Sequence, residues 1–90
     1  APALLRRIKR LNDSLASVML ITHNPGVAHL ALLLTDETSE PQRSKLNAKF
    51  STGSLAVIEA DIARWADLLP HGGHLRSFTR PRDLQQDEGA

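Results

Sequence analysis

Cysteine is absent from this chain of 90 residues. Its absence excludes disulfide bonds, thiol catalysis and zinc sites built on cysteine. Aromatic side chains are scarce, being limited to Phe50, Trp65 and Phe78, which is too few for a platform that stacks the bases of single-stranded nucleic acid. No apolar run approaches the roughly 20 residues of a membrane span. Thiol chemistry, base stacking and membrane passage are therefore not expected.

An excess of charge of either sign is also lacking. The chain has 11 basic and 10 acidic residues, for a formal net charge of +1. Because so small a net charge creates no strong field, we expect neither a nucleic-acid partner nor a membrane partner. The first residues do not resemble a signal peptide, which predicts a cytoplasmic protein. They begin on helical sequence without methionine, so we expect the native chain to start earlier.

The apolar content of 41% is typical of a globular domain. Apolar residues from Leu4 to Leu15 recur at helical spacing, opposite a face rich in arginine and lysine, and predict an amphipathic helix over about residues 3–12. We interpret its basic face as solvated, with contact to nucleic acid as the alternative. A polar variable loop is predicted over residues 35–49, and a polar tail over residues 85–90.

Two short apolar runs predict strands that are buried on both faces. They are Val18–Ile21 and Leu55–Ile58, and such runs are typical of a parallel sheet covered by helices. The first leads into a predicted helix that ends near Leu34, with Asn24 as the N-cap and Pro25 as the first helical residue. A short helix capped by Asp61 and a third, edge strand over residues 75–79 complete the prediction.

His23 is the most informative residue for function. It follows the first predicted strand and immediately precedes a helix, and ligands of open α/β sheets bind at this edge. The N–H groups at the amino end of a helix suit a phosphate. A histidine in this place can donate a hydrogen bond to a phosphoryl oxygen, or can itself be phosphorylated. A capping or packing histidine is the structural alternative.

Three segments, in order along the chain, carry a resemblance to a known family. The stretch Val18–Val27, which includes Thr22-His23-Asn24-Pro25-Gly26, resembles the second catalytic motif of the histidine phosphatase superfamily, whose fold is that of phosphoglycerate mutase. More narrowly, it resembles the SixA-type phosphohistidine phosphatases. Lys49–Val57 resembles the strand after that family's variable insertion, and Phe78–Leu84 resembles its closing segment. Thr22 departs from the glycine usual there.

The resemblance implies an α/β protein with a three-layer α/β/α sandwich and a mostly parallel sheet. Residues 1–90 would then be an incomplete C-terminal half of one such domain. In this family a first histidine, in an Arg-His-Gly-like motif, attacks the phosphoryl group, and the second, here His23, contacts its oxygens. Asn24, Thr22 and Thr52 are expected to bind phosphate or to line the edge of the pocket. No metal and no cofactor are implied, and the Arg-His-Gly-like motif has no match in this chain.

These observations predict a phosphatase that works through a phosphohistidine intermediate, on protein phosphohistidine or on a small phosphomonoester. This chain would lack the nucleophile and would be inactive alone. The alternatives are a non-catalytic interaction or regulatory module with the same fold and, more distantly, a nucleic-acid binder that uses the basic helix. An exposed sheet edge is expected to permit a homo-oligomer.

The other polar residues predict less specific roles. His71 and His74 flank two glycines and are interpreted as part of a flexible turn, because a structural zinc site needs four ligands. His29 is expected at the surface or in packing, and Glu59 and Asp61 in helix capping. The serines beside Thr52 are interpreted as turn residues, with a place at the pocket edge as the alternative.

Overall fold

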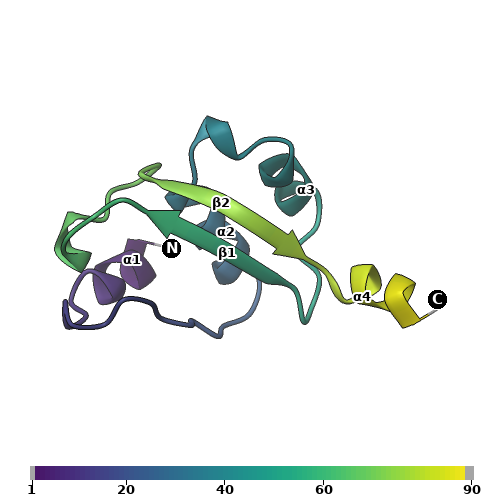
Figure 1. The fold of residues 1–90 in the computed structure, drawn as a ribbon, viewed down its shortest axis with the longest axis horizontal. Coiled ribbons are helices and arrows are strands. Elements are labelled where there is room, and N and C mark those ends of the chain that lie inside the picture. The colour runs from purple at the N-terminus through teal and green to yellow at the C-terminus, as the bar shows by residue number, and fades with distance from the viewer. Residues whose placement is uncertain (1, 89–90) are drawn as a thin grey trace.

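The computed structural model describes residues 2–88, whose helices and strands are drawn in Figure 1. In chain order its elements are α1 (Pro2–Ile8), α2 (Gly26–Leu34), the 3₁₀ turn η1 (Glu37–Ser39), α3 (Gln42–Ala48), β1 (Leu55–Ala60), the 3₁₀ turn η2 (Trp65–Asp67), β2 (Gly73–Thr79) and α4 (Pro81–Glu88). Helices α2 and α3 lie behind the sheet in Figure 1, and α4 projects beyond its end. None of the described helices has the length and apolarity to cross a membrane.

The sheet has two antiparallel strands. Leu55 pairs with Thr79 at one end and Ala60 with Gly73 at the other, with an irregularity after Val57. Burial alternates along β1, so one face of the strand packs on the helices and the other is exposed. The predicted α/β class and the predicted third strand are confirmed. The three layers and the mostly parallel sheet are not present in residues 2–88, where helices cover one face of an antiparallel pair.

Helix α2 lies at the centre of the core. One cluster joins it to α1 and to the turn near η2, through Leu5, Ile8, Leu30, Leu34 and Leu68. The other joins it to α3 and β2, through Ala31, Leu46, Leu75 and Phe78. The rings of Phe50 and Phe78 lie 5.3 Å apart at an interplanar angle of 54°, an edge-tilted geometry that aromatic pairs favour. The core therefore fixes α2 against every other large element except α4.

Helix α1 ends earlier than predicted, at Ile8. The chain then turns, because the side-chain oxygen of Asn12 accepts the N–H of Ser14 and its carbonyl accepts the N–H of Leu15. Such local hydrogen bonds compete with helix continuation. Leu15, which matches the helical spacing of the apolar residues but follows the predicted helix, is exposed.

The prediction of a buried strand at Val18–Ile21 is wrong for this structure. The segment is not part of the sheet, and all four side chains are exposed, from 41% for Val18 to 85% for Ile21. Residues 16–22 form no hydrogen bond with the rest of the described chain. A strand buried on both faces needs a neighbour that pairs with its backbone and layers that cover its side chains. Residues 2–88 supply neither to this segment.

The prediction of a loop over residues 35–49 is also wrong, because this region contains η1 and α3. Leu46 is 1% exposed and fills the core beside β2. Ser39 is equally buried, and its hydroxyl oxygen accepts the N–H of Leu75 at 2.8 Å. One apolar side chain and one satisfied buried hydroxyl thus order a stretch whose composition is polar.

Three smaller predictions need correction. Pro25 occupies the N-cap of α2, and the N-cap of η2 is Arg64, so neither Asn24 nor Asp61 caps as predicted. The predicted tail over residues 85–90 is helical as far as Glu88, and residues 89 and 90 lie outside the described part. Helix α4 begins at a proline, which suits the first helical position. The Asp83 carboxylate accepts the N–H of Arg80 just before it, at 2.9 Å.

Candidate functional site

His23 lies where the exposed apolar segment meets α2. Its carbonyl accepts the N–H of Val27 at 3.2 Å, so it closes the first turn of the nine-residue helix. The side chain is exposed. The amino end of a helix carries positive potential and presents N–H groups that no carbonyl of the helix accepts. The predicted place of His23 before a helix is confirmed, although the strand expected before it does not form.

Asn24 connects this turn to a distant part of the chain. Its side-chain amide donates a hydrogen bond to the carbonyl of Phe50 at 2.5 Å. Phe50 leads directly into the turn Ser51–Ser54, which is closed by the Ser54 N–H on the Ser51 carbonyl at 3.1 Å. Gly53 has φ +82°, a value that the third position of a type II turn requires. Asn24 thus holds the two polar segments of the predicted pocket together.

The other predicted pocket residues lie around this contact. Thr22 is partly buried and Thr52 is exposed at the tip of the turn. Within residues 2–88 neither forms a hydrogen bond with His23. The structure therefore brings Asn24 to the Phe50 segment, and among the described residues it joins neither Thr22 nor Thr52 to His23 by a hydrogen bond.

Arg80 is a cation beside the Ser51–Ser54 turn that the sequence did not single out. The next residue, Pro81, lies 3.2 Å from where a Cβ on Gly53 would stand. The Arg80 Nε atom is buried without a hydrogen-bond partner among the described residues, and its Nη2 atom lies 3.7 Å from Asp83. The backbone N–H of Arg80, more than its charge, lowers the pKa of Asp83. An arginine followed by proline at a strand end is the only sequence signal for this position.

A second polar group lies where η1 meets β2. The Asp36 carboxylate accepts the backbone N–H and the hydroxyl of Thr38, and the Thr38 hydroxyl oxygen is 3.0 Å from Nδ1 of His74. Because Thr38 gives its proton to Asp36, His74 is the donor in the second bond. The Thr38 hydroxyl bond is the main cause that lowers the pKa of Asp36. His74, predicted in a flexible turn, is therefore held at the start of β2.

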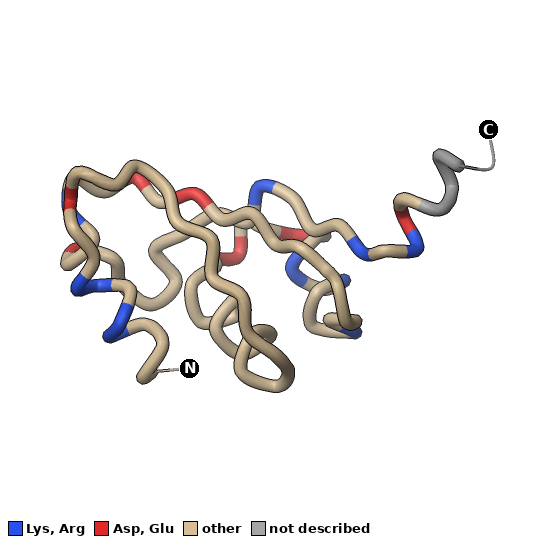
Figure 2. Tube along the Cα trace, turned by 90° about the horizontal axis from the view of Figure 1, so that it is seen from below, with Lys and Arg blue, Asp and Glu red and all other residues tan. Residues whose placement is uncertain are grey.

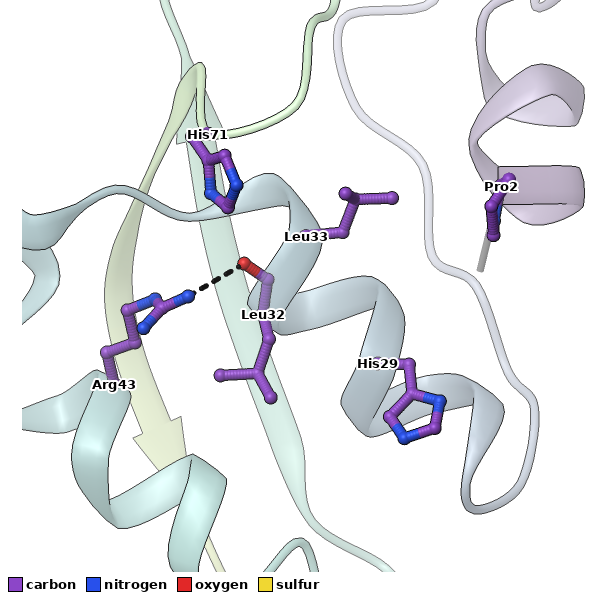
Figure 3. Close-up of a pocket in the computed structure, with 6 residues that line it drawn as sticks. All are labelled: Pro2, His29, Leu32, Leu33, Arg43 and His71. Atoms are coloured by element: carbon purple, nitrogen blue, oxygen red, sulfur yellow. Dashed lines mark hydrogen bonds between the residues drawn. The ribbon is translucent and has the colours of Figure 1, made fainter.

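Two shallow cavities lie at the carboxyl end of α2, away from His23. They measure about 310 and 450 Å³ and share Arg43 and His71. Figure 3 shows the first, with Arg43 reaching from α3 and His29 standing on α2. His29 is exposed, and so lies at the surface as predicted.

Arg43 and His71 satisfy the last carbonyls of α2. Arg43 donates to the Leu32 carbonyl and to the Thr35 hydroxyl, each at 3.2 Å. The backbone N–H of His71 donates to the Leu33 carbonyl at 2.7 Å. The ring atom Nδ1 of His71 lies 3.0 Å from the Thr35 carbonyl oxygen. Because a carbonyl only accepts, Nδ1 of His71 carries the proton. The helix end would otherwise keep unpaired carbonyls. His71 lies in the predicted turn, which the Gly72 N–H closes on the Leu69 carbonyl at 3.0 Å, and its bonds to the end of α2 hold that turn in place.

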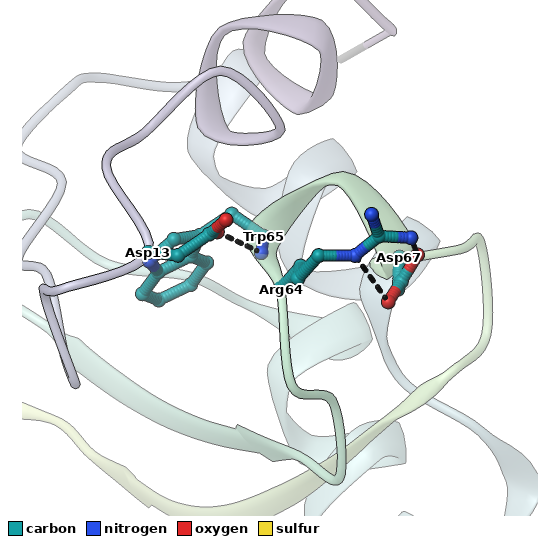
Figure 4. A network of polar contacts seen from close by, with 4 residues as sticks. All are labelled: Asp13, Arg64, Trp65 and Asp67. Carbon is teal, nitrogen blue, oxygen red and sulfur yellow. Dashed lines mark hydrogen bonds and ion pairs between the residues drawn. The ribbon is translucent and has the colours of Figure 1, made fainter.

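Trp65 forms hydrogen bonds with the part of the chain that leads to the exposed segment Val18–Ile21 (Figure 4). Its backbone N–H donates to the Asp13 carboxylate, and its indole N–H donates to the Leu15 carbonyl, both at 3.0 Å. Beside it Arg64 and Asp67 form an exposed ion pair at 3.2 Å. The apolar segment that precedes His23 is thus anchored at its start by Trp65 and at its end by α2.

Residues 2–88 contain no group of three histidine, aspartate or glutamate side chains that is arranged to hold a metal ion. Basic residues gather on α1 and just after it, near the N-terminus in Figure 2. They lie apart from the His23 turn in the chain, and none is bound to an acidic partner in the described ion pairs.

Comparison with known proteins gives one distant relative. An uncharacterized protein of Mycobacterium leprae (strain TN) is 28% identical over 79 residues, which cover 87% of this chain and 48% of that protein. The chain thus spans about half the length of the curated relative that it matches. No protein-family model and no solved structure matches it significantly.

Proposed function

We propose that this chain is the phosphate-contacting part of a histidine phosphatase of the SixA type, with His23 as the residue that contacts the phosphoryl oxygens. The observation that carries the proposal is the place of His23, exposed and closing the first turn of α2. An anion at this point would meet both the imidazole and the positive end of the helix. The three-layer sandwich with a mostly parallel sheet belongs, in this proposal, to a longer protein.

The proposed reaction, phosphoryl transfer, requires hydrogen-bond donors that are positioned around the phosphoryl oxygens. Phosphoryl transfer depends mostly on positioning and on stabilising charge that spreads over those oxygens. His23 supplies one donor, Asn24 positions the turn, and the Ser51–Ser54 segment with Thr52 lines the edge of the pocket. The substrate is a phosphohistidine of a protein or a small phosphomonoester.

The nucleophile lies outside this chain. In-line attack needs a second group on the side of the phosphorus opposite the leaving group. His71 and His74 are held by Thr35 and Thr38, and His29 stands on the surface of α2. The first histidine of the proposed mechanism therefore comes from another polypeptide segment, and residues 1–90 alone do not turn over substrate.

A turnover assay of the purified 90-residue chain tests this division of the site. With phosphohistidine and with a generic phosphomonoester we expect no product above the uncatalysed rate. Sustained turnover that is abolished by His23→Ala but survives His29→Ala would show that the chain is a complete enzyme, and the half-site proposal would be wrong.

A non-catalytic interaction or regulatory module is the second candidate. The exposed run Val18–Ile21 favours it, because a contiguous apolar surface marks a place where another polypeptide binds. Phosphate binding without turnover in every longer form of the protein would support this candidate over the enzyme.

A further inference from the structure

The carboxyl end of α2 holds polar side chains that the proposed phosphate site does not use. Arg43 and His71 line both of the cavities at this end. His23 closes the first turn of the same helix, whose nine residues span roughly 14 Å. The two ends of α2 are thus too far apart for one small anion to contact both.

Arg43 is a partly buried cation that belongs to none of the ion pairs among the described residues. Its Nε and Nη2 atoms donate to the Thr35 hydroxyl and to the Leu32 carbonyl, which fixes the plane of the guanidinium. Its Nη1 atom has no hydrogen-bond partner in residues 2–88, and it is not among their buried atoms that lack one, so it is open to solvent. Arg43 therefore presents an oriented N–H group and an unpaired positive charge.

His71 places a second nitrogen at the same end of the helix (Figure 3). Its ring is held by the bond from Nδ1 to the Thr35 carbonyl, so Nε2 is left for another partner. When the ring carries a second proton, Nε2 becomes a donor. Both side chains are fixed by bonds to the end of α2, and a ligand that uses them does not have to order them.

The walls of the first cavity are mostly apolar, and no acidic side chain lines it. Pro2, Leu32 and Leu33 contribute carbon surface beside Arg43 (Figure 3). Its volume of about 310 Å³ is at the lower end of the roughly 300–1,000 Å³ of small-molecule sites. The second cavity is lined by three acidic residues, Asp36, Glu37 and Glu40. Because these carboxylates repel an anion, an anion held by Arg43 is favoured in the first cavity.

We propose that the first cavity binds a small carboxylic acid with an apolar chain. Its carboxylate accepts the Nη1 protons of Arg43, whose planar fork matches a carboxylate, and its chain lies against Leu32 and Leu33. The bond of Arg43 to the Leu32 carbonyl offsets the negative end of the helix dipole at this point. The proposal is independent of the phosphatase assignment, because it uses neither His23 nor a phosphate.

Titration of the ¹⁵N-labelled chain with hexanoate tests the site. We expect saturable shifts of the amides of Leu33, Thr35 and His71, with a Kd of about a millimolar because the cavity is shallow. The amides of residues 23–27 should not shift, which separates this site from the phosphate site. Hexanamide has the same chain without the charge and should bind about tenfold more weakly, because the charge-assisted hydrogen bond is lost.

Variants assign the binding to the two side chains. Arg43→Gln removes the cation and should weaken hexanoate binding about tenfold. Arg76→Gln is the matched control, at an exposed arginine of β2 that pairs with Glu59, and should bind as the wild type does. His71→Asn tests the site by a second route and should weaken binding about threefold. Asparagine is among the residues that most readily adopt a positive φ such as the 61° at this position.

Three results would overturn the proposal. The first is a set of shifts that grow linearly up to tens of millimolar hexanoate, which would show that there is no defined site. The second is hexanamide that binds as tightly as hexanoate, which would show that the charge is not recognised. The third is a folded Arg43→Gln variant with the affinity of the wild type. If Arg43→Gln does not fold, wild-type affinity of His71→Asn overturns the proposal in its place.

Discussion

The side-chain amide of Asn24 donates a hydrogen bond to the carbonyl oxygen of Phe50, 26 positions along the chain. This contact joins the His23 turn to the segment that enters β1, and it is the link through which the two polar parts of the proposed pocket meet. We expect Asn24→Ala to lower the free energy of unfolding by about 1 kcal/mol and to weaken phosphate binding. Urea unfolding measures the first effect. Asn47→Ala, at an exposed residue of α3, is the control and should change neither.

The Trp65 anchor predicts a second outcome. Asp13→Ala removes the acceptor of the Trp65 N–H, and we expect a loss of about 1 kcal/mol of stability together with stronger quenching of tryptophan fluorescence by acrylamide. The chain has one tryptophan, so the signal is specific. Asp67→Ala breaks only the exposed ion pair with Arg64 and should change stability by less than about 0.5 kcal/mol. Equal losses of stability from Asp13→Ala and Asp67→Ala would contradict the claim that the Asp13–Trp65 hydrogen bond anchors this part of the chain.

The lowered pKa of Asp36 makes part of the stability depend on pH. A carboxylate with a lower pKa in the folded state stabilises the fold above its unfolded pKa of about 3.9, and this contribution disappears as the pH falls through the folded value. Thr38→Val removes the main cause of the shift. We therefore expect the variant to be less stable than the wild type at pH 7, and the difference to narrow below about pH 4.

Urea midpoints of both proteins between pH 7 and pH 2.5 check this prediction. Thr52→Val, at an exposed threonine of the Ser51–Ser54 turn, serves as the control and should run parallel to the wild type. A constant difference between Thr38→Val and the wild type across the range would show that the Thr38 hydroxyl acts independently of the charge on Asp36.

The order of residues 42–48 depends on one buried side chain. Leu46 is 1% exposed between α2 and β2, and Leu46→Ala should cost about 2–5 kcal/mol, a large share of the stability of so small a domain. Leu84→Ala, at a side chain 58% exposed on α4, should cost less than about 0.5 kcal/mol. Similar unfolding midpoints for the two variants would mean that α3 is not part of the core.

Sequence patterns predicted those elements whose cause is local. The helix that became α2 and the strands β1 and β2 were found because apolar periodicity and turn residues mark them directly. Helix α3 was missed because its evidence is a single buried leucine, Leu46. The turn η1 was missed because its evidence is the hydrogen bond between Ser39 and Leu75, a contact between distant parts of the chain. The Val18–Ile21 run was misjudged for the opposite reason. Its composition matches a buried strand, but burial depends on neighbours, and the described chain does not provide them.

In the candidate site too, sequence patterns predicted what depends on local order and missed what depends on tertiary contacts. The position of His23 before a helix follows from the order of residues. The contact between Asn24 and Phe50, the helix cap made by Arg43 and His71, and the proximity of Pro81 to Gly53 depend on tertiary packing. No spacing in the sequence encodes them.

Titration of the ¹⁵N-labelled chain with inorganic phosphate tests the central proposal most directly. The account predicts saturable shifts of the amides of His23, Asn24, Gly26 and Val27. It also predicts that His23→Ala weakens binding about tenfold, since the hydrogen bond that the imidazole donates to the anion is lost, whereas His29→Ala, on α2, binds as the wild type does. If phosphate leaves these amides unshifted, or if His23→Ala binds as tightly as the wild type, His23 does not hold a phosphoryl group.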